Sequence, residues 1–314
     1  MTSLVTGAAG FIGSTLAEEL IARGDRVLGV DSFLDYYPRE AKERNLAKLR
    51  GEGHFELIES SLSELDLRAL VKRCRRIFHL AAQAGVRASW GKDFSIYTSN
   101  NILATQQLLE AAKGAEIDAF VFASSSSVYG DAAKLPMEED VPLHPVSPYG
   151  VSKLAAEKLC ELYQTNHGIH TVSLRYFTVY GPRQRPDMAF HRLLRCALDE
   201  NPFLLYGDGK QTRDFTFIAD AVEATIAASE RGRPGAVYNI GGGSRVSMLH
   251  VIETIESITG KKLTIDKRPK EKGDMRDTYA DTSAARLDLG YEPGTELIDG
   301  LRQEWAWMRQ LAAQ

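Results

Sequence analysis

The sequence has little cysteine and no pattern of metal ligands. Its three cysteines are widely spaced over 314 residues and form no Cys-x-x-Cys pair. This argues against a disulfide framework and suggests a reducing compartment. The seven histidines form neither a His-x-His nor a His-Glu-x-x-His arrangement, so we expect no metal site. The cysteines are then expected to be small hydrophobic side chains of the core.

Long apolar runs and an excess of basic charge are missing as well. No apolar run of about 18 residues indicates a membrane span, and the first residues lack the basic and apolar regions of a signal peptide. Lys and Arg number 38 against 42 Asp and Glu, a net charge of −4, which disfavours a nucleic-acid partner. We therefore expect a cytoplasmic enzyme with no nucleic-acid and no membrane partner.

Short β-branched runs alternate with longer helical patterns in the first half of the chain. The runs predict strands at residues 3–6, 27–31, 55–59, 77–81, 120–124 and 171–176. A period of 3.6 residues predicts helices at 14–23, 102–113 and 151–163, and a last helix is expected at 301–311. Repeated strand–helix–strand units predict an α/β fold, a Rossmann-type doubly wound parallel sheet with helices on both faces. From Gly181 onward, recurring prolines predict a smaller, mixed α/β C-terminal lobe.

A glycine-rich loop follows the first predicted strand and opens the first predicted helix. Residues 7–13 read Gly-Ala-Ala-Gly-Phe-Ile-Gly, and such glycines let a pyrophosphate approach the free N–H groups of a helix N-terminus. Asp31 ends the second strand, where a carboxylate accepts hydrogen bonds from an adenosine ribose. Ser32 and Phe33 follow it, and the lack of an arginine for a 2′-phosphate favours NAD over NADP. A structural turn beside a solvated aspartate is the alternative.

A serine, a tyrosine and a lysine form the second motif. Tyr149 and Lys153 are four residues apart and share one helix face. A lysine ammonium beside a phenol lowers the pKa of the phenol, and a positive nicotinamide ring lowers it further. The phenol then becomes a base for a sugar or alcohol hydroxyl. Ser125 follows the strand at 120–124 and can hydrogen-bond the same hydroxyl, so we predict Ser125, Tyr149 and Lys153 as catalytic residues.

Together these motifs resemble the extended short-chain dehydrogenase/reductase family. The resemblance runs through nearly the whole chain and is carried by residues 7–13, Asp31, residues 79–82, 101–105, 124–130, the Tyr149/Lys153 pair, 213–215 and 238–242. It implies a tightly held NAD in a domain of residues 1–177. It also implies a nucleotide-sugar-binding lobe formed mainly by residues 178–314, some segments of which return to the first domain.

The resemblance implies a set of cofactor-binding residues that starts at the glycine loop and ends near the catalytic helix. Where the family commonly has an aspartate at the adenine, this chain has Ser61, a weaker acceptor. The residues expected to bind NAD are Gly7, Gly10, Phe11, Ile12, Gly13, Asp31, Ser61, Leu62, Leu80, Ala81, Ala82, Asn101, Tyr149, Lys153 and Tyr176.

Within the family, residues 175–189 resemble the UDP-glucuronate 4-epimerases, with Thr178 where the family more usually has asparagine. The implied reaction interconverts UDP-glucuronate and UDP-galacturonate through a transient 4-keto sugar, and the NAD is recycled. A 4-keto uronate is a β-keto acid, which loses CO₂ when its carboxylate bond aligns with the carbonyl π system. The enzyme must therefore hold the carboxylate in another orientation. Ser126, Ser127 and Thr178 offer hydroxyl donors for this, and Arg185 offers a charge.

The UDP group carries about two negative charges and a planar base, which require cations and a flat surface. Arg213 resembles the family's pyrophosphate arginine, Tyr206 is placed to stack on uracil, and Asp274 to accept from the ribose. The residues expected to bind UDP are Arg87, Arg192, Tyr206, Gln211, Arg213 and Asp274.

Three alternatives stay open: a UDP-glucose 4-epimerase, a UDP-glucuronate decarboxylase and a non-catalytic NAD-sensing protein. Related decarboxylases and dehydratases carry an acidic residue where this chain has Ser126 and Ser127, and serine is no acid or base at neutral pH. A pure sensor needs none of the three predicted catalytic residues. Family members pair the helices at 102–113 and 151–163 across a two-fold axis, so a homodimer is expected.

Overall fold

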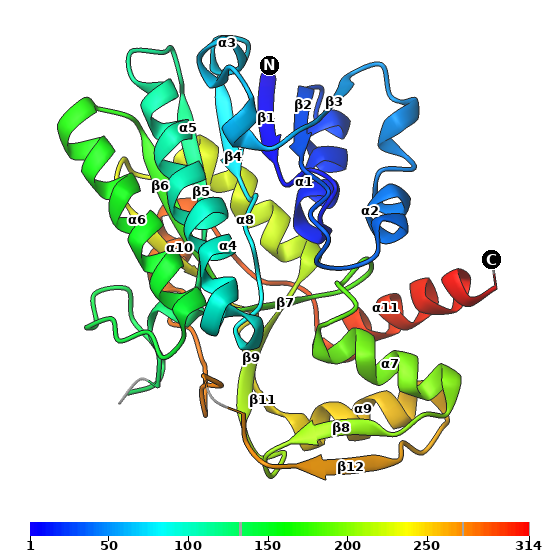
Figure 1. Ribbon diagram of the computed structural model, residues 1–314. Coiled ribbons are helices and arrows are strands. Elements are labelled where there is room, and N and C mark those ends of the chain that lie inside the picture. The colour runs from blue at the N-terminus through cyan, green and yellow to red at the C-terminus, as the bar shows by residue number, and fades with distance from the viewer. Residues whose placement is uncertain (132–133, 272, 314) are drawn as a thin grey trace.

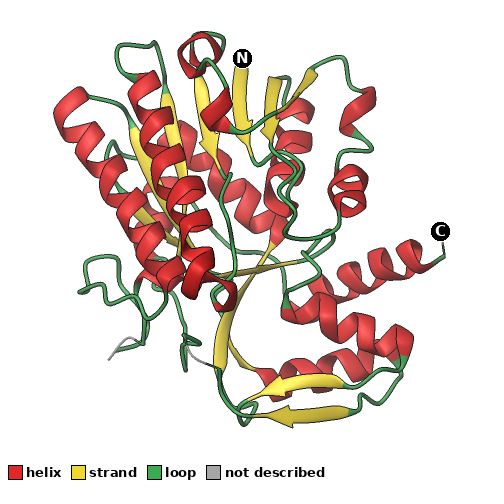
Figure 2. Cartoon of the chain, in the orientation of Figure 1, coloured by secondary structure: helices red, strands yellow, loops and turns green. Residues whose placement is uncertain are grey.

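The computed structural model describes residues 1–131, 134–271 and 273–313. Its largest element is a seven-stranded sheet with the strand order β10-β6-β5-β4-β1-β2-β3, in which every neighbouring pair is parallel (Figures 1 and 2). The strands are β1 (Thr2–Thr6), β2 (Arg26–Asp31), β3 (Phe55–Glu59), β4 (Arg76–His79), β5 (Ala119–Ser125), β6 (Thr171–Tyr176) and β10 (Val237–Ile240). The Rossmann-type prediction is confirmed.

The sheet is buried on both faces because helices cover each of them. Every residue of β6 is buried, as expected for a strand between two helical layers. One layer contains α3 (Leu67–Val71), α4 (Phe94–Tyr97), α5 (Ala104–Ala112) and α6 (Pro148–His167). The other contains α1 (Phe11–Ala22), α8 (Ile218–Arg231) and α10 (Ser283–Leu289), and α2 (Arg39–Asn45) packs on α1. Figure 1 shows α4, α5 and α6 together on the left of the sheet.

The predicted strands lie within two residues of the observed ones at each end, and the helices differ more. The first helix begins at Phe11 because Gly10 is its N-cap. The predicted helix at 102–113 continues from a π-helical turn, Thr98–Leu103, into α5. Such turns are rare and frequently mark functional sites.

The smaller lobe lies below the large sheet in Figure 1, and its described residues form two small sheets and three helices. The first sheet has the order β11-β9-β7 and the second pairs β12 with β8. Its strands are β7 (Thr178–Tyr180), β8 (Phe203–Tyr206), β9 (Thr212–Phe217), β11 (Arg245–Ser247) and β12 (Ile265–Arg268). Its helices are α7 (Ala189–Asp199), α9 (Met248–Thr259) and α11 (Leu297–Ala312).

The chain passes from the large sheet to the small lobe over a single residue. Tyr176 ends β6, and Thr178 begins β7. The intervening Phe177 still donates its N–H to Ile240 of the large sheet, at 2.9 Å. Residues 218–240 and 283–289 then return to the large sheet as α8, β10 and α10. The division into domains at residue 177 stays a proposal, with these returning segments assigned to the first domain.

None of the helices in the described ranges is long and apolar enough to cross a membrane. Among the same residues, no three His, Cys, Asp or Glu side chains gather as metal ligands. Cys74 and Cys160 are buried, and Cys196 is partly buried.

Candidate active site

A cavity of about 1000 Å³, here called the central cavity, lies where the carboxyl ends of the sheet strands meet the small lobe. Open α/β sheets bind their ligands at this edge, outside the carboxyl ends of the strands. Of the predicted cofactor residues, all but Asn101 line the cavity. The predicted catalytic and substrate residues line it without exception: Arg87, Ser125, Ser126, Ser127, Tyr149, Lys153, Thr178, Arg185, Arg192, Tyr206, Gln211, Arg213 and Asp274.

The glycine loop has the shape that a bound pyrophosphate requires. A Cβ on Gly13 would lie 2.1 Å from the Gly7 carbonyl oxygen, so only glycine allows the loop to close onto the helix. Gly7 has a φ of +72°, and a Cβ there would lie 2.9 Å from the Ala81 nitrogen. The N-cap Gly10 provides no side-chain cap, and the first turn of α1 contains no acidic residue. The helix N-terminus is therefore open to an anion, and the loop fits a dinucleotide.

Asp31 ends β2 at the position expected for a ribose acceptor and is itself firmly held. Its carboxylate accepts from the N–H groups of Ala9, at 3.0 Å, and Phe33, at 2.8 Å. The Lys42 ammonium lies 3.4 Å from the same carboxylate, and both side chains are buried. No arginine follows Asp31 in the sequence, but α2 brings a lysine to this place. Lys42 lines the central cavity, and the sequence analysis missed it.

Tyr149 and Lys153 lie on the first turns of α6, and Ser125 is the last residue of β5. The Lys153 ammonium donates to the Ala123 carbonyl oxygen at 2.8 Å. The Ser125 hydroxyl accepts from the Ser127 N–H at 3.1 Å. The Tyr149 ring stands edge-on to Tyr97, with 6.2 Å between ring centroids.

The effect of Lys153 on the pKa of Tyr149 stays a prediction, because burial is the largest influence on the pKa of each of these two groups. Burial raises the pKa of Tyr149 above its usual value, while Ser125 and then Arg185 lower it in part. Burial also lowers the pKa of Lys153 to about 8. Desolvation disfavours the charged form of each group. The charge that lowers the pKa of the phenol comes from Arg185, 36 residues after Tyr149 in the sequence.

A buried ion pair connects the catalytic helix α6 to the neighbouring strand β6. Glu157, one turn after Lys153 on α6, forms two hydrogen bonds with the Arg175 guanidinium, at 2.7 and 3.1 Å. The Ser124 hydroxyl donates to the same carboxylate at 2.6 Å. Arg175 also donates to the Tyr129 hydroxyl at 2.8 Å. This network fixes α6 to β5 and β6 next to Ser125 and Tyr176.

The predicted carboxylate-binding residues lie at one end of the central cavity. Ser126 and Ser127 form a short turn after β5, and Thr178 is the first residue of β7. The Arg185 guanidinium is engaged by Asp187 through two hydrogen bonds of 3.0 Å. Asp187 therefore neutralises part of the charge that Arg185 brings to the cavity. The sequence analysis did not predict this pairing.

Four of the predicted UDP-binding residues contact one another in the central cavity: Arg87, Tyr206, Gln211 and Asp274. Arg87 forms an ion pair with Asp274 at 2.7 Å, and its guanidinium carbon lies 4.2 Å from the centroid of the Tyr206 ring. Tyr206 therefore has one face covered by Arg87, and uracil stacking on that face requires Arg87 to move. The Gln211 amide donates to the Tyr206 carbonyl oxygen at 2.9 Å, while its own side-chain oxygen is buried without a partner among the described residues. This side-chain oxygen is suited to accept a hydrogen bond from a ligand.

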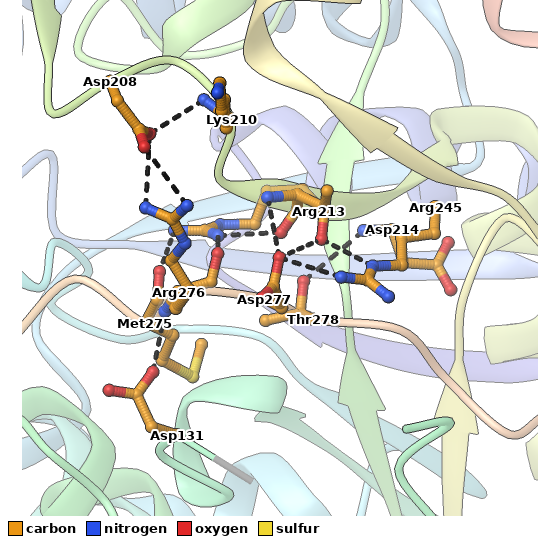
Figure 3. A network of polar contacts seen from close by, with 11 residues as sticks. Asp131, Asp208, Lys210, Arg213, Asp214, Arg245, Met275, Arg276, Asp277 and Thr278 are labelled. Atoms are coloured by element: carbon orange, nitrogen blue, oxygen red, sulfur yellow. Dashed lines mark hydrogen bonds and ion pairs between the residues drawn. The ribbon is translucent and has the colours of Figure 1, made fainter. Parts of the chain in front are cut away.

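Arg213 connects β9 to the segment that carries Asp274 (Figure 3). Its guanidinium donates to the carbonyl oxygens of Thr212 at 2.8 Å, Met275 at 2.8 Å and Arg276 at 3.1 Å. Burial lowers the pKa of Arg213, and nearby carboxylates, with Asp274 first, oppose this. The arginine faces the central cavity but is also a structural crosslink, so its predicted pyrophosphate contact stays a prediction.

Asn101 is not among the residues that line the central cavity, and its predicted cofactor contact stays a prediction. It lies in the π-helical turn and is 1% exposed. Its amide accepts from the Gln83 N–H at 2.7 Å and donates to the Gln83 carbonyl oxygen at 3.0 Å. It also donates to the Ser152 hydroxyl at 2.9 Å. Asn101 thus holds the cavity wall after β4 against α6, because the π-helical turn directs its side chain inward.

Comparison with known proteins agrees with this geometry. Residues 3–241 match the NAD dependent epimerase/dehydratase family. The chain belongs to this family. The crystal structure of UDP-glucuronic acid 4-epimerase from Bacillus cereus in complex with UDP-glucuronic acid and NAD is 46% identical, with a TM-score of 0.97 over 99% of this chain and all of that one.

Two curated members of the family show the same full-length agreement. The uncharacterized UDP-glucose epimerase YtcB of Bacillus subtilis is 48% identical over 99% of both chains. The UDP-glucuronate 4-epimerase of Thermodesulfobacterium geofontis is 36% identical over 98% of this chain and 96% of that protein.

The sequence analysis did not predict three residues of the site: Lys42, Glu157 and Asp187. Lys42 lies in the short, highly charged α2, whose sequence gives no apolar stripe to show which side is buried. Glu157 follows Lys153 by four residues, the spacing of one helix face, and that spacing was the one signal able to reveal it. Asp187 is two residues after Arg185 and reads in sequence as a solvated charge.

Proposed function

We propose that this protein is a UDP-glucuronate 4-epimerase that interconverts UDP-glucuronate and UDP-galacturonate and uses NAD without consuming it. One observation carries the proposal: Ser125, Tyr149 and Lys153 line the same cavity as Ser126, Ser127, Thr178 and Arg185. A hydroxyl-oxidising group is thus combined with hydroxyl donors and a cation suited to a carboxylated sugar. The full-length similarity to the Bacillus cereus enzyme supports it.

The chain's own residues move one proton and orient the sugar. The Tyr149 phenolate accepts the proton of the sugar 4-hydroxyl, and Ser125 hydrogen-bonds the same oxygen. Bound NAD supplies the hydride acceptor and donor for C4 and a positive ring charge near the phenol. The Lys153 ammonium, fixed by the Ala123 carbonyl, favours the phenolate. After the sugar has presented its other face, Tyr149 returns the proton to the oxygen on C4, so the net change is inversion at C4.

The carboxylate end of the cavity prevents loss of CO₂ from the 4-keto sugar. Ser126, Ser127 and Thr178 donate to the carboxylate and hold its bond out of line with the carbonyl π system. Serine at 126 and 127 supplies no proton for elimination. These assignments distinguish an epimerase from a decarboxylase.

Incubation with UDP-glucuronate and, separately, with UDP-glucose tests the proposal. We expect UDP-galacturonate from the first and little turnover of the second, with no free CO₂ and no accumulation of NADH. Chromatography of the sugar nucleotides separates the products. Formation of a UDP-pentose as the main product would contradict the proposal, as would turnover of UDP-glucose alone.

UDP-glucose 4-epimerase is a second candidate, because the Bacillus subtilis relative carries that name. Neutral hydroxyls surround the C6 end of the sugar, and Arg185 is already paired with Asp187. Such a site also admits a 6-hydroxyl. The ratio of kcat/KM for the two sugars decides between the candidates.

We further propose that the protein is a cytoplasmic homodimer. Leu103, Val151 and Leu162 are about half exposed, at 49%, 46% and 56%. They lie in the π-helical turn and on α6, which run side by side with α5 on one face of the molecule (Figure 1). Sedimentation of the wild type is expected to give a dimer, and Leu162→Glu a monomer; a monomeric wild type would contradict the proposal.

A further inference from the structure

A second cavity, here called the rear cavity, lies behind the catalytic one. It has a volume of about 470 Å³, within the range of about 300–1000 Å³ that small-molecule sites occupy. Its walls come from α2, the segment before α7, α7 itself and α11, which Figure 1 shows together on the right of the molecule. Tyr37 and Arg185 line both cavities, so the two are neighbours separated by these side chains.

One wall of the rear cavity is cationic. Arg44, Arg183, Arg185 and Arg195 line it together with His191, and no aspartate or glutamate belongs to the lining. The carboxylates that pair with three of the arginines, Glu18, Asp187 and Asp199, stand outside it. In the described part of the chain Arg44 forms no ion pair. Arg44 therefore offers the wall a guanidinium with no carboxylate partner among the described residues, while the charges of the other three arginines are partly neutralised from outside the cavity.

The opposite wall is apolar and comes from one face of α11. Trp307, Met308 and Leu311 line it, and the indole ring of Trp307 stands edge-on to His191 at 5.9 Å between centroids. A cavity with a cationic wall and a flat aromatic wall matches a ligand that combines an anionic group with an apolar ring.

The cationic wall is rigid at its centre. Gln184 is 2% exposed and its side-chain oxygen accepts from the His191 N–H at 2.9 Å. Its carbonyl oxygen lies 2.9 Å from His191 Nδ1, and since a carbonyl only accepts, this nitrogen carries the ring proton. Arg183 adopts a φ of +73°, a conformation that a non-glycine residue keeps only where its surroundings impose it. The His191 imidazole and the backbone at Arg183 are thus held in place before any ligand arrives.

We propose that the rear cavity is a second binding site, for a small phosphate monoester with an aromatic or flat apolar body. Arg44 and Arg195 bind the phosphate, and the body lies against Trp307. Because Arg185 lines both cavities, an occupant of the rear cavity changes the position of a cation that faces the substrate. Binding at the two sites is then coupled, and by linkage the coupling is reciprocal. That consequence rests on the proposed function, but the binding itself does not.

Phenyl phosphate is the probe, added to NAD-loaded protein with UDP present to fill the catalytic cavity. We expect saturable quenching of tryptophan fluorescence and a matching calorimetric heat. Inorganic phosphate, which lacks the ring, and phenol, which lacks the charge, are each expected to bind at least tenfold more weakly. Phenol binding as tightly as phenyl phosphate would overturn the proposal, because charge would then have no role.

Substitutions in the rear cavity test whether phenyl phosphate binds there. The double variant Arg44→Gln/Arg195→Gln is expected to weaken phenyl phosphate at least tenfold, while Arg68→Gln/Arg302→Gln, which removes two exposed arginines outside both cavities, binds as the wild type does. Trp307→Phe is expected to lose the fluorescence signal. Equal affinity in the two double variants, or a signal that persists without Trp307, would overturn the site. Neither readout needs turnover, so failure here is distinct from failure of the epimerase assay.

Discussion

At the scale of single residues, the environment of Tyr149 decides how the reaction starts. Burial raises the pKa of its phenol, so nearby positive charge favours formation of the phenolate base. Tyr149→Phe removes the one group placed to take the proton and keeps the ring. We expect kcat to fall by about 10²–10⁴-fold, measured as UDP-galacturonate formation. The NAD released on denaturation serves as the control and is expected to match the wild type; wild-type turnover would contradict the assignment.

Thr178 is expected to govern the product rather than the rate. A hydrogen bond to a charged group is worth about 1.5–3 kcal/mol, so Thr178→Ala should let the carboxylate align with the 4-keto group more often. We expect the fraction of UDP-pentose and CO₂ to rise by roughly 10- to 100-fold, measured with carboxyl-labelled UDP-glucuronate. Thr165→Ala, an exposed change on α6, is the control. Unchanged epimerisation without pentose would remove Thr178 from the carboxylate site.

At the scale of elements, α6 combines the catalytic side chains with the ion pair that holds them. Glu157 and Arg175 are about 2% and 3% exposed, so Glu157→Ala leaves a guanidinium buried without its carboxylate. Breaking a buried pair in this way costs about 3–5 kcal/mol, and we expect that loss in the free energy of unfolding by urea. Glu161→Ala removes an exposed glutamate of the same helix and is expected to change it by less than about 0.5 kcal/mol. Equal effects of the two substitutions would contradict the role of the pair.

At the scale of the whole molecule, Asp214 ties the small lobe to segments that return from the large sheet. Its carboxylate accepts from the N–H groups of Gly242 at 2.7 Å and Ala280 at 3.0 Å. Burial nevertheless raises its pKa to about 6 from the ordinary 3.8. Between these values the folded protein binds more protons than the unfolded one, so the contribution of Asp214 to stability is complete below pH 3.8. It is lost as the pH rises to about 6.

The loss amounts to about 3 kcal/mol, from a shift of about two pKa units. Free energies of unfolding at fixed NAD concentration, measured from pH 4 to pH 7 for the wild type and Asp214→Asn, give the difference due to this group. We expect the wild-type advantage to decrease with rising pH. An advantage that grows with pH would show that the backbone hydrogen bonds to Asp214, rather than its burial, set the pKa.

Much of the fold followed from local pattern. The strands at 3–6 and 171–176, the glycine loop and the Tyr149/Lys153 spacing are properties of neighbouring residues, and the structure contains each of them. The seventh strand, β10, was missed because Val237–Ile240 is short and lies beyond the expected domain boundary. Asn101 was assigned to the cofactor because the resemblance gave its position, whereas the π-helical turn decides its direction.

The sequence by itself determined which residues carry the chemistry, since a phosphate loop and a phenol beside a lysine are specified by short spacings. Tertiary structure alone decided the ion pairing and the pKa values of these residues. Lys42 reaches Asp31 from another helix, Asp187 neutralises part of Arg185, and burial raises the pKa of Tyr149 although Lys153 is near. Solvent exclusion and the approach of distant segments depend on the whole packed molecule, and no local pattern encodes them.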